Sequence, residues 1–229
     1  MKRNNSIPYK ILGIISGLCF ILSVIYGIIY FGLVRGDLFD SIIEDENLEE
    51  NLGIESNELE YAMDEMVSYV KSWDESETAQ IKVTVNGKKE DFYIEDEMSH
   101  LKDVKLLIKL LDKVFIGSFL TALVISLVLW RKKKLRELGR GYFSGLGIVA
   151  VLAAVVAVIA GSDINKFIEL FHNIFFSQGG WVFDLDKSRI VWFFSDGLYQ
   201  KALVILGLSM TIILGGIAAV DAIYLRKSK

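Results

Sequence analysis

Four long stretches of the chain carry no charged side chain, and they limit its possible folds more than any other feature. They cover residues 11–34, 114–130, 141–162 and 202–220 of the 229. A helix needs about 20 apolar residues to cross the ~30 Å hydrocarbon layer of a bilayer. Backbone polar groups in lipid must be satisfied within the protein, so each run should be a helix. The sequence therefore predicts a mainly α membrane protein with four transmembrane helices, the last extending over residues 202–225.

The first run starts like a signal peptide but does not end like one. Lys2, Arg3 and Lys10 precede it, as basic residues precede a secretory signal. The apolar stretch is too long for a signal-peptide core, and no A-x-A-like cleavage site follows it, so we expect a retained helix. Cys19, the only cysteine, then lies in hydrocarbon, where a thiol is neither a nucleophile nor half of an external disulfide.

Basic clusters flank the four runs on one side. They lie before the first helix, between the second and third at residues 131–140, and near the C-terminus. Short basic flanks stay in the cytoplasm, so both termini and the 131–140 loop should be cytoplasmic. Residues 35–113 and 163–201 then lie outside, and the first of these loops carries most of the acidic residues. Basic residues in so tight a turn cannot follow a nucleic-acid duplex but suit anionic membrane lipids.

The first outer loop, residues 35–113, has the pattern of a small extracellular cap. Residues 59–73 repeat apolar side chains at helical spacing, through Tyr61, Met66, Tyr69 and Val70. A second helical pattern begins at Met98 and leads towards the second span, with lysines opposite an apolar stripe formed by Leu101, Val104, Leu107, Ile108 and Leu111. The lysines are Lys102, Lys105, Lys109 and Lys113. Between the helices, alternating apolar residues around Asn86-Gly87, followed by Phe92 and Ile94, predict a β-hairpin with a tight turn.

The second outer loop, residues 163–201, begins with an amphipathic segment and becomes strongly aromatic. The apolar face of the segment consists of Ile164, Phe167, Ile168, Phe171 and Phe175. Aromatic residues then crowd the stretch from Trp181 to Tyr199, where the chain meets the outer headgroups. We interpret most of these rings as an interfacial belt that anchors the protein. The alternative is that some of them line a lipid pocket.

The two histidines, His100 and His172, both fall in outer loops near helix ends at the membrane surface. At 100° per residue, His100 lies within the apolar stripe of its helix, and His172 borders the stripe of its own segment. A single such histidine is usually a core residue. Two of them, in a chain with no other, make a functional pair as reasonable as a packing role. Asp103, one turn after His100, has the spacing to hold its ring in one tautomer, although it can equally pair with a lysine.

Sites for metals and nucleotides have little support. The two histidines and an acid could bind zinc, but neither H-E-x-x-H nor a CxxC set is present. Asp184 and Asp186 resemble the start of a calcium loop that lacks its glycine and closing glutamate. Walker-type loops, G-x-G-x-x-G and G-x-S-x-G are absent as well. We therefore expect no cofactor and no metal.

Three short motifs resemble the lipoprotein intramolecular transacylase family of bacterial membrane enzymes. They are SHLKDVK at residues 99–105, FHNIFF at 171–176 and WVFD at 181–184. Four helices, a long first outer loop with a position like Tyr69, and the apolar run 189–194 extend the resemblance over nearly the whole chain. The sequence departs from the family in having Gly179 and Gly180 before the tryptophan, where Asn or Asp is expected, and in lacking a proline near Ser195.

The resemblance implies an enzyme at the outer surface of a bacterial cell membrane. Its reaction moves the sn-2 acyl chain of a lipoprotein's diacylglyceryl-cysteine to the α-amino group of that cysteine, which gives a lyso-form lipoprotein without a cofactor. His100 and His172 then serve as acid, base and oxyanion-stabilising groups. Supporting or pocket residues are Asp103, Tyr69, Phe175, Phe176 and Trp181. The implied partners are diacylated lipoproteins and membrane lipids, with the enzyme itself a monomer.

Three other functions are compatible with parts of the sequence. A membrane accessory or sensor protein would use the acidic cap to bind a partner, and both histidines would merely be packed. A metal-dependent enzyme or another hydrolase at the outer surface would need a metal or nucleophile that the motifs do not supply. A transporter is disfavoured because no ionisable residue interrupts the central parts of the four spans.

Overall fold

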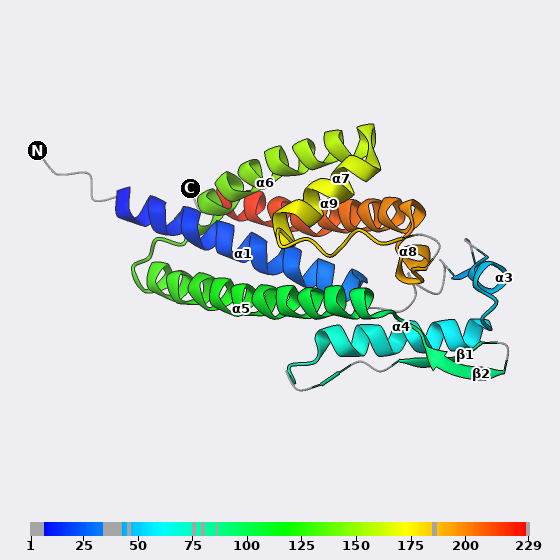
Figure 1. The fold of residues 1–229 in the computed structure, drawn as a ribbon. Coiled ribbons are helices and arrows are strands. Elements are labelled where there is room, and N and C mark those ends of the chain that lie inside the picture. Colours follow the sequence, from blue (N-terminus) through cyan, green and yellow to red (C-terminus); the bar gives the residue numbers. More distant parts are fainter. Residues whose placement is uncertain are drawn as a thin grey trace, which may run out of the picture. The chain divides into compact units, whose positions relative to one another are not determined.

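The computed structural model describes residues 7–33, 43–44, 47–74, 77–78, 81–85, 87–184 and 187–227 (Figure 1). The described residues form two compact units. The first, here called the membrane unit, draws on Met1–Phe31, Asp112–Val158 and Ile205–Lys229. The second, here called the cap unit, draws on Gly32–Leu111 and Ile159–Val204.

Four helices of the described chain are long and apolar enough to cross a membrane, which confirms the predicted spans. They are α1 (Ile7–Leu33), α5 (Glu95–Arg131), α6 (Arg136–Ser162) and α9 (Asp196–Lys227). As predicted, the helix that begins in the first outer loop runs without a break into the second span. The connection between these two helices is shorter than the expected loop over 131–140, because α5 continues to Arg131 and α6 begins at Arg136. Arginine is a good helix former.

The membrane unit is held together by small and polar residues. A Cβ built on Gly141 of α6 would lie 1.9 Å from the carbonyl oxygen of Gly13 in α1, so the two backbones touch at this point. The hydroxyl of Tyr142 donates to the Leu214 carbonyl of α9 at 2.7 Å, and the hydroxyls of Ser23 and Ser118 join α1 to α5 at 3.0 Å. Close approach at glycine and hydrogen bonds between helices are the usual means of association in lipid.

The cap unit contains short helices, a hairpin and the first turns of α5. Its elements in chain order are α3 (Leu48–Leu52), α4 (Ser56–Lys71), β1 (Lys82–Val85), β2 (Lys88–Asp91), α7 (Ile164–Phe175) and α8 (Ile190–Phe193). The strands pair antiparallel, with Lys82 opposite Asp91 and Val85 opposite Lys88. Gly87 has φ +78°, as the predicted tight turn requires, whereas Asn86 lies outside the described residues. The second strand ends at Asp91, before the Phe92 and Ile94 that we expected within it.

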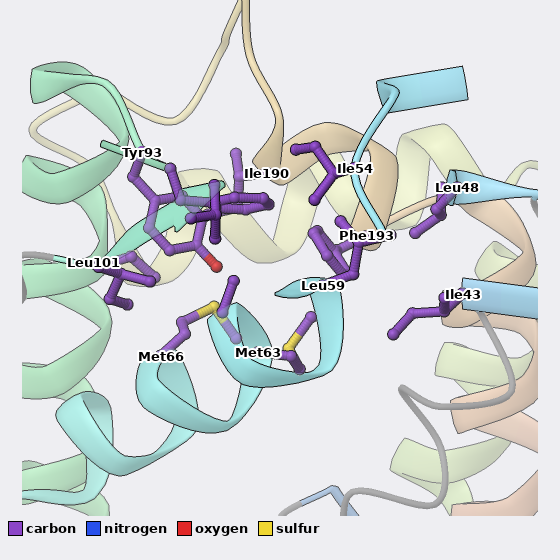
Figure 2. Close-up of a cluster of buried hydrophobic side chains, with 14 of the residues drawn as sticks. Ile43, Leu48, Ile54, Leu59, Met63, Met66, Tyr93, Leu101, Ile190 and Phe193 are labelled. Atoms are coloured by element: carbon purple, nitrogen blue, oxygen red, sulfur yellow. The ribbon is translucent and has the colours of Figure 1, made fainter. Parts of the chain in front are cut away.

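One hydrophobic cluster joins α3, α4, β1, the start of α5 and α8, and Figure 2 shows part of it. Met63 and Met66 of α4 pack with Leu101 of α5, and Ile190 and Phe193 of α8 belong to the same cluster. The buried face of α4 also includes Leu59, Ala62, Tyr69 and Val70. Tyr61, predicted to be on that face, is exposed because it lies off the i, i+3, i+4 repeat that these residues follow.

The lysines of α5 correct another prediction. Lys105 and Lys109 are buried, whereas Leu106 and Leu110 are exposed. The ammonium of Lys105 lies 4.2 Å above the ring of Tyr69 and 3.3 Å from a carboxylate oxygen of Glu77. An aromatic face and an acid therefore satisfy the charge, while the aliphatic stem packs on apolar surface. Periodicity alone could not show that α4 supplies such partners.

Candidate active site

Two histidines from separate segments of the cap unit face each other. His100 lies near the start of α5, and His172 lies in α7. Their ring centroids are 5.7 Å apart, with the ring planes inclined by 32°. The two residues are only 8% and 9% exposed, so the helical phase turns both towards the interior as predicted. α7 is fixed at its start by Asp163, whose carboxylate accepts a hydrogen bond from the Lys166 N–H at 3.1 Å.

Aromatic rings close around the imidazole pair. Phe176 lies 4.9 Å from His100 and 5.5 Å from His172 between ring centroids. Trp181 stacks on His172 at 4.7 Å with an angle of 29°. Phe183, which we did not select from the sequence as a site residue, lies 5.7 Å from His100. Two of the expected pocket residues, Phe176 and Trp181, therefore meet at the histidines in an environment of low polarity.

The other two expected pocket residues make their contacts elsewhere. Phe175 is exposed, and its ring packs against Phe171 at 4.8 Å. Tyr69 is buried in α4 beneath the ammonium of Lys105. The structure therefore does not bring Phe175 or Tyr69 to the imidazoles through these contacts.

The backbone fixes the tautomer of His172. Its Nδ1 lies 2.8 Å from the carbonyl oxygen of Ile168, one turn earlier in α7. A carbonyl oxygen only accepts hydrogen bonds, so Nδ1 carries the proton and donates. In the neutral ring the lone pair is then on Nε2, which is the atom able to accept a proton from a substrate.

Asp103 does not hold His100 by the hydrogen bond that its spacing suggested. Its Oδ2 accepts a hydrogen bond from the side-chain amide of Gln178 at 2.9 Å. Nδ1 of His100 is buried and has no hydrogen-bond partner among the described residues. Gln178 comes from the second outer loop, 75 residues along the chain from Asp103. Only the folded structure can therefore show that its amide binds the Asp103 carboxylate. Asp103 thereby ties that loop to α5 one turn from His100.

Comparison with known proteins identifies the fold and the family. The family described as lipoprotein intramolecular transacylase Lit matches residues 13–199. The chain belongs to this family. No curated protein sequence matches it.

Solved structures of a Lit protein share the fold of this chain. The membrane-integral lipoprotein intramolecular transacylase Lit of Bacillus cereus superposes with a TM-score of 0.75 at 14% identity, over 96% of this chain and 98% of that one. A form of the same protein with one histidine replaced by arginine gives 0.73 at 15% identity, over 98% and 96% of the two chains. A form with an alanine replacement gives 0.73 at 16% identity, over 97% and 94%. At these identities the likeness shows the fold.

Burial keeps both histidines of this Lit family member neutral near pH 7. Burial, assisted by the neighbouring His172, lowers the pKa of His100 to about 4, although the charge of Asp103 opposes the shift. Burial also lowers the pKa of His172, against the effect of the Ile168 carbonyl. His100 precedes the charge-free part of α5 by about 20 Å along the helix and so lies outside the membrane-spanning segment. Two neutral imidazoles can each accept one proton and donate another.

Glycine explains one departure from the pattern that the resemblance led us to expect. Gly179 and Gly180 have φ +82° and +80°, a conformation that side chains with a Cβ rarely adopt. They form the turn between Phe176 and Trp181, where the Gly179 N–H donates to the Phe176 carbonyl at 3.0 Å. The turn lets both rings reach the histidines.

Residues that could hold a metal do not gather in the described part of this protein. It contains no group of three histidine, cysteine, aspartate or glutamate residues placed to bind an ion. Asp184, considered above for a calcium loop, forms an ion pair with Lys187 at 3.2 Å. Its companion Asp186 lies outside the described residues.

Proposed function

We propose that this chain moves the sn-2 acyl group of a lipoprotein's diacylglyceryl-cysteine to the α-amino group of the same cysteine. The observation that carries the proposal is the pair of buried, neutral imidazoles 5.7 Å apart. Membership of the transacylase family supports acyl transfer as the type of reaction. The pair provides the two functions that such a transfer needs, a base for the amine and a donor for the oxyanion.

The reaction is internal to one lipid-modified residue. The amine nitrogen attacks the ester carbon, the bond from that carbon to the glycerol oxygen breaks, and one proton moves from nitrogen to oxygen. The ring of the tetrahedral intermediate contains the nitrogen, two cysteine carbons, sulfur, two glycerol carbons, the ester oxygen and the acyl carbon. Such a ring closes slowly in solution, whereas an aromatic enclosure that holds the amine against the ester can supply effective molarities of ~10⁵ M or more. Ester to amide is downhill, so no cofactor is required.

The tautomer of His172 suits it to the role of base. Its Nε2 accepts the amine proton, and the resulting imidazolium keeps its hydrogen bond to the Ile168 carbonyl and its stacking on Trp181. His100 is harder to protonate and stays neutral, so its N–H donates to the oxyanion. His172 then returns the proton to the departing glycerol oxygen. Asp103 and Gln178 support the loop beside His100.

The surface of α7 supports a site at the depth of the lipid ester. Leu170, Ile174 and Phe175 are exposed on one arc of this helix, and polar residues are exposed on another. His172 lies at the boundary between the arcs. α7 begins immediately after the α6 span, so a helix of this kind can lie in the plane of the interface with its boundary at the glyceryl groups. The basic cytoplasmic clusters support an outer-leaflet location.

The test is mass spectrometry of a lipoprotein's N-terminal peptide from a host that makes only diacylglyceryl lipoproteins. Expression of this chain should leave the peptide mass unchanged but move one acyl chain to nitrogen, as fragment ions and resistance to mild alkali would show. His172→Asn, present in the membrane at an equal amount, should abolish the transfer, and His100→Asn should strongly reduce it. An unchanged diacylglyceryl peptide despite confirmed expression would contradict the proposal and favour a non-catalytic role for the cap.

A further inference from the structure

A fully buried carboxylate lies one turn before His100, and no sequence pattern pointed to it. Glu97 is 0% exposed. Its Oε2 accepts from the Ile94 N–H at 2.8 Å, at the start of its own helix. Its Oε1 accepts from the Ser188 hydroxyl at 2.6 Å and from the Ile190 N–H at 2.8 Å. One side chain therefore accepts hydrogen bonds from backbone N–H groups at the beginnings of both α5 and α8.

The segment that Glu97 binds follows closely in the chain after the aromatic residues that contact the histidines. Phe183, whose ring contacts His100, precedes Ser188 by one short stretch of chain. The next residue, Arg189, forms an ion pair with Glu90 of β2 and donates to the Asp91 carbonyl at 3.1 Å. Ile190 and Phe193 then enter the hydrophobic cluster of the cap unit (Figure 2). The second outer loop is thus fastened at its far end to α5 and the hairpin.

We propose that Glu97 is a positioning residue that, through Ser188 and Ile190, helps to hold Phe183 and Trp181 against the two histidines. It acts through geometry, because the charges that shift the pKa of His100 are those of His172 and Asp103. A carboxylate suits the position because each of its two oxygens is directed at backbone or hydroxyl donors. An amide of the same size cannot accept on both sides, so one donor would face an NH₂ group. The effect on catalysis rests on the proposed transacylase function, but the effect on the histidines does not.

The experiment compares Glu97→Gln and Ser188→Ala with Glu95→Gln, an exposed acid in the same turn. Diethyl pyrocarbonate modification of the protein's only two histidines, followed by peptide mass spectrometry, reports how well the loop covers them. Glu97→Gln should raise the modification rate at least severalfold, and Ser188→Ala should raise it less. Turnover should fall by about ten- to a hundredfold in Glu97→Gln, because small misplacements near reacting groups cost rates of this order. Glu95→Gln should match the wild type in both measurements.

Several outcomes would overturn the proposal. Glu97→Gln with wild-type histidine reactivity would do so, even if its melting temperature fell, because that pattern is a purely structural effect. If Glu97→Gln does not fold, Ser188→Ala decides, since it leaves the carboxylate and its other bonds in place. If the wild type has no transacylase activity, the proposed function fails, while the modification rates still decide whether Glu97 positions the loop.

Discussion

His100 and His172 are chemically alike but differ in what their ring nitrogens contact, and the roles proposed for them rest on this difference. Glutamine at His100 retains an N–H donor, so His100→Gln should lose about 10²-fold in kcat. Glutamine at His172 cannot accept the amine proton, so His172→Gln should lose about 10³–10⁴-fold. Saturating kinetics on a diacylglyceryl lipopeptide in nanodiscs would measure both. Loss of activity in the opposite order would exchange the two roles.

The lowered pKa of His100 makes stability depend on pH in a defined window. Between about 4 and 6.5 the unfolded state binds a proton at this residue and the folded state does not. Its contribution to the unfolding free energy is therefore complete above pH 6.5 and is lost as pH falls towards 4. Thermal melting followed by circular dichroism should show the wild type losing more stability between pH 7 and 5 than His100→Gln. Equal losses would mean that His100 is not held neutral.

Helical phase was enough to predict from the sequence that both histidines face the interior. It could not reveal the hydrogen bond from Gln178 to Asp103, or the contacts of Lys105 with Tyr69 and Glu77. Each of these contacts joins segments that are far apart in the chain. Side-chain partners of this kind depend on the tertiary fold.

At the scale of single elements, α7 combines the proposed base, His172, with a surface suited to lipid. Ile174 is 63% exposed on the apolar arc, and its neighbour Asn173 is exposed on the polar arc. Nitroxide labels at Ile174→Cys and Asn173→Cys, in a Cys19→Ser background, provide a matched pair. In vesicles the label at 174 should be accessible to oxygen and shielded from a polar nickel reagent, whereas the label at 173 should show the reverse. Equal accessibility would mean that α7 does not lie at the interface.

The contact between α1 and α6 predicts an unequal response to two glycine substitutions in one helix. A Cβ at Gly141 meets the α1 backbone, while a Cβ at Gly147 meets nothing within 4 Å. Gly141→Ala should therefore destabilise the protein by about 1–3 kcal/mol through overpacking. Gly147→Ala should be neutral or slightly stabilising. Melting followed with a thiol-reactive dye on Cys19 would compare them, and equal melting temperatures would exclude the close contact.

Local signals predicted the elements better than their ends. Long charge-free runs indicated the four spans, and Asn86-Gly87 between alternating residues indicated the hairpin. The second strand was predicted too long, and α6 begins at Arg136, earlier than the charge-free run implied. Hydropathy marks where lipid begins, whereas a helix continues for as long as its backbone hydrogen bonds do.

On the scale of the whole molecule, the direction of the chain across the membrane decides whether the site can meet its proposed substrate. Six of the residues at 131–140 are lysine or arginine, which should keep this connection in the cytoplasm. This orientation would place the two histidines on the opposite, outer side, where lipoproteins of the proposed kind would be displayed. The distribution of charge and the proposed chemistry are thus consistent with each other, although they rest on different residues.

Cysteine labelling tests this orientation without reference to activity. In a Cys19→Ser background, Lys132→Cys reports the basic connection, and Asn57→Cys, an exposed residue of α4, reports the cap. A membrane-impermeant maleimide should label Asn57→Cys in intact cells and Lys132→Cys only after lysis. The reverse pattern would place both histidines on the cytoplasmic side, away from the outer-leaflet lipoproteins. The proposed reaction would then need a different substrate, even if the imidazole pair kept the geometry described above.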